Sequence, residues 1–359
     1  MEKIEGISGF FKHLGVEARY FDLGRRIRQI DNPVFEKSDL HNAPYPYPYL
    51  RSAWLGVVFW SSETHSSPMV WTLKFPLDET NRLHPEDRDR FLQQLLITIG
   101  TNLRAAKTGE RLQAVLDNNP YSFDLPDDRR ASYHAKVSAL LGRPPSRFYD
   151  DTLKYFQSPD TESWKALGIQ GLADVAARWK DNHSLLCQAM SVLPDPAFIG
   201  ITQLLEHEML DIKLVTAITE RLKSTLSLVQ NPENAVINGA LIAAGIRGIS
   251  LSDASYLRQQ TLLKVMAVLP KPDVEVIAAL ASRCYEDLAN EEVGLQFLEL
   301  LAKLGHDNFI QVISDLMSLP EVRPHIMQAF RHTARSETLN AAIGALFNRV
   351  QQAEASLKN

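Results

Sequence analysis

A twelve-residue pattern that occurs twice constrains the fold of this chain more than any other feature. Residues Leu185–Pro196 read LLCQAMSVLPDP, and residues Thr261–Pro272 read TLLKVMAVLPKP. The proline turns at 194 and 270 lie 76 residues apart, and further turn residues stand near 232 and 308. A break therefore recurs about every 38 residues, with helix-like apolar periodicity on both sides of it.

A period of this length predicts a repeated pair of helices. One pair cannot bury its own apolar face, whereas a stack of pairs buries a continuous core. The period is close to that of HEAT and armadillo repeats, and the Trp, Leu-Gly and Tyr pattern of tetratricopeptide repeats is absent. We therefore predict an all-α, HEAT-like helical-repeat domain, an α-solenoid, over residues 161–359. A non-repeating helical bundle is the alternative.

The first 160 residues carry mixed strand and helix signals. The segment Ala53–Trp60 is apolar on both faces, which is typical of a central strand, and Met69–Phe75 alternates like a neighbouring strand. Pro85 is followed by two acids, which predicts the start of a covering helix. The polar strip Ser158–Thr161 marks the boundary. We predict a small α+β domain over residues 1–160, with about four antiparallel strands plus helices, in a chain that is predominantly α overall.

The charge balance argues against a nucleic-acid partner. Of the 359 residues, 38 are Lys or Arg and 43 are Asp or Glu, and the whole excess of five acids lies in residues 161–359. A protein that binds nucleic acid usually carries a basic excess. No apolar run is long enough to span a membrane, and the two cysteines are isolated, as is typical of a reducing compartment. These features predict a cytoplasmic protein without a membrane segment.

Motifs that would identify an enzyme are missing. The chain has no phosphate-binding loop, no dinucleotide-binding glycine pattern and no nucleophile elbow, and it offers no spacing that predicts a metal site or a cofactor. Glu63 and His65 lie in the polar connector Ser61–Ser67 between the two strands. A general base or a metal ligand at this loop is the enzyme hypothesis, and a solvated loop is its alternative.

Two sets of side chains are candidates for a partner surface. Three arginines follow a strand-like segment, where they could meet an anionic partner or protect an edge strand with charge. Aromatic residues are dense from position 45 to position 71, and a strand that is apolar on both faces needs a cover on each side. If local helices cover only one face, the other is a docking surface. The candidates are Arg25, Arg26, Arg28, Tyr45, Tyr47, Tyr49, Trp60 and Trp71.

Several short motifs resemble one known family. They are Tyr20–Arg26, Pro44–Pro48, Ala53–Leu55 and Gly168–Asp174. The chain is similar along nearly its full length to an uncharacterised proteobacterial family that is known only as a domain of unknown function. The resemblance implies a soluble bacterial protein, and it brings no activity and no catalytic residues.

The function predicted from the sequence is a non-enzymatic one. A helical array offers a long surface to a protein partner, so the chain is predicted to be a protein–protein interaction or scaffold protein. One alternative is an enzyme of unknown class with its site near the hairpin loop that holds Glu63 and His65. A second alternative is a nucleic-acid-associated factor that uses Arg25, Arg26 and Arg28.

Overall fold

The computed structural model describes residues 4–61, 68–99, 116, 119–229, 238–269 and 271–357. The chain divides into two compact units, residues 1–130 and residues 131–359. The first unit holds a four-stranded sheet and the second is helical, so the predicted combination of a small α+β part and a larger all-α part is confirmed at this level.

The sheet of the first unit is antiparallel throughout, with the strand order β2-β1-β3-β4. Strand β3 is its centre and pairs with β1 on one side and β4 on the other. The apolar character of β3 on both faces agrees with its burial, because Val57 and Phe59 on one face and Val58 on the other are all at most 1% exposed. The strands are β1 (Glu17–Asp22), β2 (Arg28–Ile30), β3 (Ser52–Trp60) and β4 (Met69–Pro76).

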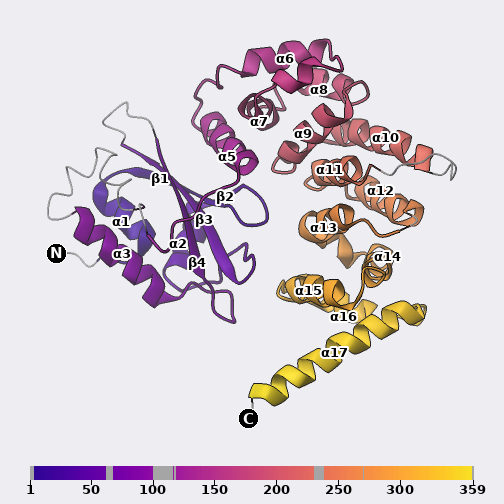
Figure 1. Ribbon diagram of the computed structural model, residues 1–359. Coiled ribbons are helices and arrows are strands. Elements are labelled where there is room, and N and C mark those ends of the chain that lie inside the picture. The colour runs from indigo at the N-terminus through magenta and orange to yellow at the C-terminus, as the bar shows by residue number, and fades with distance from the viewer. Residues whose placement is uncertain are drawn as a thin grey trace. The chain divides into compact units, whose positions relative to one another are not determined.

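Helices α1 (Gly6–Leu14) and α3 (Pro85–Ile99) cover one face of the sheet, and α2 (Asn32–Asp39) contacts α1 and β1 (Figure 1). The core between them is aromatic. The ring of Phe11 lies 4.7 Å from Phe59 and 5.4 Å from Trp71, and Trp71 makes an edge contact with Phe91. Burial of such rings is a main source of stability in a unit of this size.

Both ends of α1 follow from local chemistry. Gly15 adopts a φ of 65° and its N–H donates to the carbonyl of Lys12, which caps the C-terminal end of the helix. At the other end, the buried carboxylate of Asp39 accepts hydrogen bonds from the backbone N–H groups of Ile7 and Ser8, at 3.0 and 2.8 Å. These bonds satisfy donors that the first turn of a helix leaves open.

The second face of the sheet carries a short chain segment of its own unit. The N–H of Lys74 donates to the carbonyl of Tyr121 at 2.7 Å, and the ring of Phe123 stands edge-on to Trp54 at 4.9 Å. Residues 121–123 thereby pair with part of the edge strand β4. Strand-edge groups that find partners in this way do not recruit a foreign strand.

The described residues of the second unit form helices and two 3-10 turns. Its elements are α5 (Asp127–Leu140, which begins just before the unit), α6 (Tyr149–Gln157), the 3-10 turn η2 (Ser163–Ala166), α7 (Ile169–Ala177), α8 (His183–Ala189), α9 (Asp195–Leu205), α10 (Ile212–Val229), α11 (Gly239–Ile249), α12 (Ser255–Val268), α13 (Val274–Arg283), the 3-10 turn η3 (Tyr285–Ala289), α14 (Glu291–Ala302), α15 (His306–Met317), α16 (Arg323–Ala329) and α17 (Glu337–Leu357).

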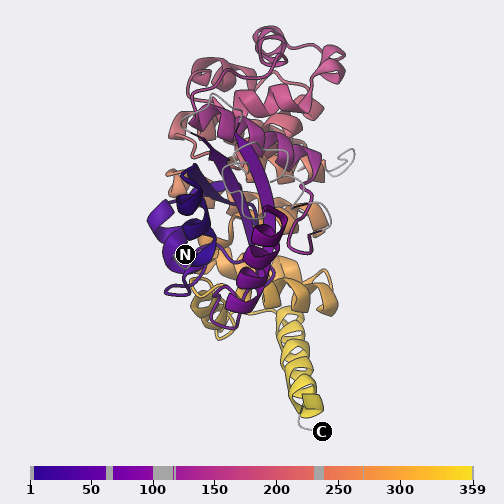
Figure 2. The same cartoon turned by 90° about the vertical axis from the view of Figure 1, so that its left-hand side faces the viewer.

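These helices pack in two parallel rows. Helix α7 contacts α9, α9 contacts α11 and α11 contacts α13, while α8, α10, α12 and α14 form the second row in the same way. The rows stand side by side in Figure 1, and in Figure 2 α17 continues past the last stacked helices. From α7 to α14, most contacts between helices join a helix to its second neighbour along the chain, and α10 and α11 also contact each other across the two rows.

The core of the second unit runs through the stack without a break. Helix α11 supplies Leu241 and Ile249 to one apolar cluster and Ile242 and Ile246 to the next, so it joins the two. Close approach of α6 and α7 depends on Gly171, because a Cβ at that position would stand 2.7 Å from the carbonyl oxygen of Phe148. Sustained contact between layers is what a stack of helix pairs needs for stability.

Each copy of the duplicated pattern lies where one helix ends and the next begins. Its first copy spans α8, a turn and the start of α9, and its second copy ends α12 and leads to α13. Leu193 and Leu269, which hold the same position in the two copies, are both buried. The predicted turns at 232 and 270 lie outside the described residues.

The division between the units falls at residue 130, whereas the predicted boundary followed residue 160. The reason is packing: α6 contacts α7 and α8, so it belongs to the helical unit despite the polar strip that follows it. Within the described part of the chain, no helix combines the length and the apolar composition needed to cross a membrane.

Candidate functional site

Two of the predicted side-chain sets meet in the first unit. The Tyr-Pro segment before β3 lies beside the end of β1 and the loop to β2, and each of its three tyrosines contacts a charged side chain there. The hydroxyl of Tyr45 donates to Asp22 at 3.2 Å, and the guanidinium groups of Arg28 and Arg25 lie 4.4 and 5.0 Å from the ring centres of Tyr47 and Tyr49. We call Asp22, Arg25, Arg28, Tyr45, Tyr47 and Tyr49 the arginine–tyrosine cluster.

The extended backbone of the Tyr-Pro segment explains this spacing. Each proline disfavours helix at the residue before it, so the segment stays extended. Its course is fixed by hydrogen bonds at both ends: Tyr45 N–H donates to Asn81 at 2.7 Å, and the indole N–H of Trp54 donates to Tyr49 at 3.0 Å. The three rings are thus held along the loop that carries the arginines.

Asp22 is the electrostatic centre of the cluster. Its carboxyl is almost fully buried, and burial raises its pKa to about 7. The N–H of Gly24, the charges of Arg28 and Arg129 and the hydroxyl of Tyr45 oppose that shift without cancelling it. A carboxyl group with a pKa near neutrality gains or loses its proton in the physiological range.

The raised pKa of Asp22 predicts a stability that depends on pH. Because the folded protein holds this proton more tightly than the unfolded chain does, the stabilising contribution is fully present below pH 4 or so and is lost as the pH rises through about 7. The substitution Asp22→Asn keeps an acceptor for Gly24 and Tyr45 but removes the titration. We expect it to raise the free energy of unfolding at pH 8, by up to about 4 kcal/mol, with little change at pH 4.

Urea unfolding of the parent and the Asp22→Asn variant between pH 4 and pH 8.5 measures this difference. Other titrating groups are common to both proteins, so they cancel when the two profiles are subtracted. Two parallel profiles would show that Asp22 titrates alike in the folded and unfolded states, and the burial argument would be wrong.

Two of the candidate arginines are buried, and the other remaining candidates lie outside the arginine–tyrosine cluster. Arg26 is 3% exposed and Arg25 is 5% exposed, so neither presents its charge to solvent. Trp71 is 1% exposed within the aromatic core, whereas Trp60, at the end of β3, is half-buried and lies 5.4 Å from the guanidinium of Arg19. Glu63 and His65, on which the enzyme hypothesis depends, lie outside the described residues.

The second unit contains a cysteine, a histidine and an aspartate in contact. Nε2 of His183 lies 3.0 Å from Oδ2 of Asp211 and 3.6 Å from the Sγ of Cys187. In a nucleophilic triad the thiol and the carboxylate contact different ring nitrogens, whereas here they share one. Burial, with the charge of Asp211, also raises the pKa of the thiol, which keeps it protonated. The group therefore lacks the arrangement of a catalytic triad.

A second polar group ties three layers of the stack together. Glu206, which follows α9, pairs with Arg283 of α13 at 2.8 Å, and the charges of His207 and Arg247 lie close by. Although burial works against ionisation, these cations lower the pKa of Glu206 to about 2. Glu206 is therefore ionised at neutral pH, and we interpret it as a structural link.

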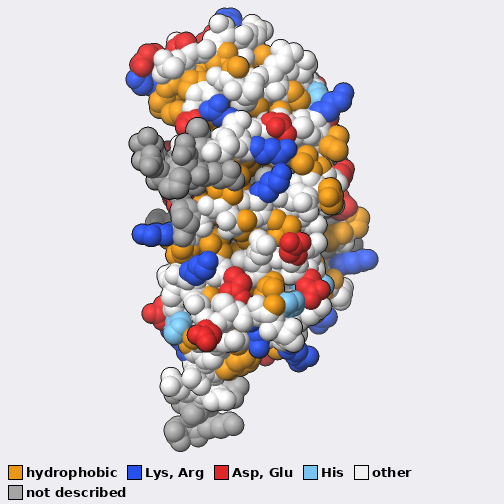
Figure 3. Space-filling model, turned by 90° about the vertical axis from the view of Figure 1, so that its right-hand side faces the viewer, with side chains coloured by type: hydrophobic (Ala, Val, Ile, Leu, Met, Phe, Trp, Pro, Cys, Tyr) orange, Lys and Arg blue, Asp and Glu red, His pale blue; other side chains and the backbone are white. Residues whose placement is uncertain are grey.

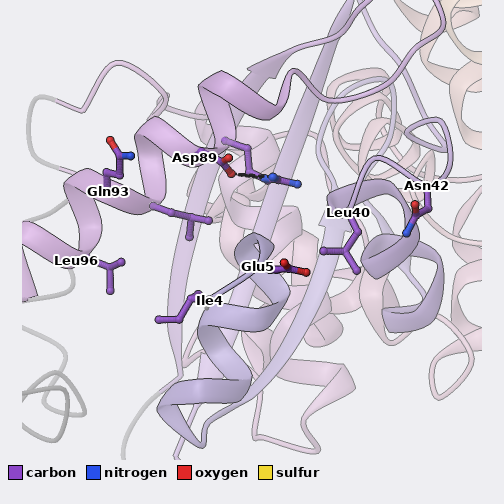
Figure 4. A pocket seen from close by; sticks show the side chains of 9 residues that line it. Ile4, Glu5, Leu40, Asn42, Asp89, Gln93 and Leu96 are labelled. Atoms are coloured by element: carbon purple, nitrogen blue, oxygen red, sulfur yellow. Dashed lines mark hydrogen bonds and ion pairs between the residues drawn. The ribbon is translucent and has the colours of Figure 1, made fainter. Parts of the chain in front are cut away.

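A cavity of about 520 Å³ opens in the first unit between the start of α1, the end of α2 and α3 (Figure 4). Its lining mixes leucines with polar groups. The guanidinium of Arg88, which lines this cavity, is already engaged: it pairs with Asp89 at 2.7 Å and donates a hydrogen bond to the carbonyl of Asp39. Among the described residues, no group of three or more His, Cys, Asp or Glu side chains is arranged to hold a metal ion.

Sequence reasoning found the arginines and tyrosines but missed their shared partner. Asp22 lies within the motif Tyr20–Arg26, but the sequence only indicated a strand-like segment at this point. The available signal was an acid at the end of a strand-like segment, just before a loop of glycine and arginines. The pairs Glu206–Arg283 and His183–Asp211 join residues 77 and 28 positions apart, and no local pattern indicates them.

Comparison with known proteins places the chain in a family. A search of curated proteins and a search of solved structures each found no significant match. Residues 2–347 match a family described as "Protein of unknown function (DUF3549)", which covers nearly the whole chain and both units. This confirms the family resemblance expected from the short motifs. The chain belongs to the DUF3549 family of proteins of unknown function.

Proposed function

We propose that the protein is a non-enzymatic interaction or scaffold protein, and that its second unit is a HEAT-like α-solenoid whose surface binds a protein partner. The layered contacts of the two helix rows carry this proposal, because alternate helices pack on one another from α7 to α14. Solenoids of this kind use extended surfaces to bind other proteins. Both copies of the pattern lie where one helix ends and the next begins, which supports a repeated unit.

The array exposes apolar side chains at the N-terminal ends of helices in both rows. Ile212 is the first residue of α10 and is 63% exposed, and Tyr256 is the second residue of α12 and is 76% exposed. A hydrogen bond of 3.0 Å from Leu210 N–H to Leu251 joins the turns before these helices, so the two side chains lie at the same edge of the array. Two further exposed apolar side chains lie at the N-terminal ends of helices in the other row. Val192 is in the turn before α9 and is 62% exposed, and Val274 is the first residue of α13 and is 65% exposed. Aromatic residues such as Tyr256 are enriched among the residues that carry the binding energy of interfaces, and the other exposed apolar side chains add contact area.

One edge of the array is expected to hold the partner. We would compare the parent with the double variants I212S/Y256S and V192S/V274S by affinity capture from the native cell and mass spectrometry. All four side chains are exposed, so both variants should keep the circular dichroism and melting temperature of the parent. We expect one variant to lose a protein that the parent and the other variant retain, since hot-spot anchors carry most of the binding energy.

Each double variant is the control for the other, because both remove two exposed apolar side chains from the same array. Capture of the same proteins by the parent and by both variants would contradict binding at these edges.

The surface charge agrees with a protein partner. On the face drawn in Figure 3, Lys and Arg side chains are interspersed with Asp and Glu, and hydrophobic side chains are exposed between them. A nucleic-acid interface usually shows a continuous basic stripe, and this face has none.

A further inference from the structure

The turn at the start of β3 holds its backbone in a costly conformation. Leu50 and Arg51 have φ angles of 48° and 54°, and Tyr49 and Ser52 on either side exchange both backbone hydrogen bonds, at 3.1 and 3.0 Å. This is a two-residue hairpin turn with positive φ at both positions, for which Asn-Gly is the favoured sequence. A leucine and an arginine there cost about 1 kcal/mol or more each.

The turn is rigid and its side chains face solvent. The N–H of Leu77 donates to the carbonyl of Arg51 at 2.9 Å, and the indole of Trp54 holds the carbonyl of Tyr49. Leu50 is 57% exposed and Arg51 is exposed as well. The fold therefore accepts a backbone cost at a fixed point that presents an apolar and a cationic side chain together. Strain of this kind concentrates at positions that bind ligands.

One further exposed cation lies on strand β4, which pairs with the strand that follows the turn. The ammonium group of Lys74 lies 4.2 Å from the ring centre of Trp54, whose ring contacts that of Tyr49. Within the described residues, neither Arg51 nor Lys74 forms an ion pair with a carboxylate. An exposed leucine beside an exposed arginine, with the cation of Lys74 on strand β4, fits a ligand that brings both carboxylates and an apolar side chain.

We propose that the Leu50–Arg51 turn is a docking point for an acidic protein segment, which places an apolar side chain on Leu50 and carboxylates on Arg51 and Lys74. Binding of single-stranded nucleic acid is disfavoured because Tyr47, Tyr49 and Trp54, the rings on which bases would stack, already lie against protein cations. The surface belongs to the first unit and is independent of the proposed binding by the helical array.

The test uses the full chain and a fluorescein-labelled peptide, Glu-Glu-Leu-Glu-Glu-Leu-Glu-Glu, in fluorescence polarisation. One variant, L50N/R51G, replaces the turn with its favoured sequence, and another, R51Q/K74Q, removes the charges but keeps Leu50. The control V34N/K37Q removes an exposed apolar side chain and a cation from α2 of the same unit. We expect the peptide affinity to fall about tenfold or more in the first two variants and to stay unchanged in the control.

A thermal melt separates loss of binding from loss of structure. L50N/R51G should melt above the parent because the strain is relieved, while its peptide binding falls. The proposal is overturned if the peptide does not bind the parent or binds all variants equally. It is also overturned if a Lys–Leu peptide or a single-stranded oligonucleotide binds better than the acidic peptide. A lower melting temperature for L50N/R51G would remove the strain argument and with it the proposal.

Discussion

The substitution Leu193→Asp, or Leu269→Asp, is expected to unfold the helical unit. Leu193 and Leu269 occupy the same position in the two copies of the repeated pattern and are 1% and 6% exposed. Removing a buried leucine costs about 2–5 kcal/mol, and burying a carboxylate without a partner adds several more. The sum is comparable with the entire stability of an ordinary domain.

Circular dichroism and thermal unfolding measure this effect. The neighbouring substitutions Val192→Asp and Ala267→Asp are matched controls, because they place the same charge on exposed positions of the same segments. The controls should retain the melting temperature of the parent to within a few degrees, since surface substitutions usually change stability by less than about 0.5 kcal/mol.

The pair of substitutions also tests whether the two copies are equivalent. Each copy ends a helix of one row and leads into a helix of the other, so both variants should fail to a similar degree. If both variants melt at the same temperature as the parent, these leucines do not lie in the interior. A collapse confined to one variant would show that the two copies are not equivalent parts of a repeat.

Local features of the fold were predictable from the sequence because they depend on neighbours in the chain. The segment that is apolar on both faces predicted the central strand β3, and the alternating segment after it predicted the neighbouring strand β4. Pro85 with its two acids predicted the start of α3.

Other features depend on contacts between distant segments, which periodicity does not encode. The three arginines and the three tyrosines were identified as separate sets, and the buried Asp22 that joins Tyr45 to the arginine loop was not found. The boundary after residue 130 depends on the packing of α6 against α7 and α8, whereas the polar strip at 158–161 only indicated a turn.

A buried ion pair gives the second large expected effect. Arg258 of α12 and Asp287 of η3 form two contacts, with Nε 2.6 Å from Oδ2 and Nη2 2.9 Å from Oδ1, and both residues are buried. Arg258 also donates to the carbonyl of Ser252 at 2.7 Å. Although burial opposes the charge, Asp287 holds the pKa of Arg258 above its ordinary value. The two partners are 29 residues apart, and no sequence pattern predicted the pair.

Breaking this pair from either side is expected to destabilise the helical unit by about 3–5 kcal/mol. Asp287→Ala leaves a guanidinium buried without its carboxylate, and Arg258→Met leaves the carboxylate without its cation. Replacing both partners, in R258M/D287L, should restore most of the loss, because no uncompensated charge remains. Urea unfolding of the four proteins gives the coupling energy as a double-mutant cycle.

The exposed pair Arg349–Asp307 provides the comparison within the same unit. Its two side chains lie 3.2 Å apart but are 62% and 97% exposed, so solvent screens their attraction. Asp307→Ala should therefore leave the unfolding curve unchanged. If Asp287→Ala has as little effect as Asp307→Ala, the Arg258–Asp287 pair is open to water in solution, and the layer formed by α12, η3 and α14 is looser than its contacts indicate. A large loss that the double replacement recovers would show instead that burial of the charges, more than their contact, sets the cost.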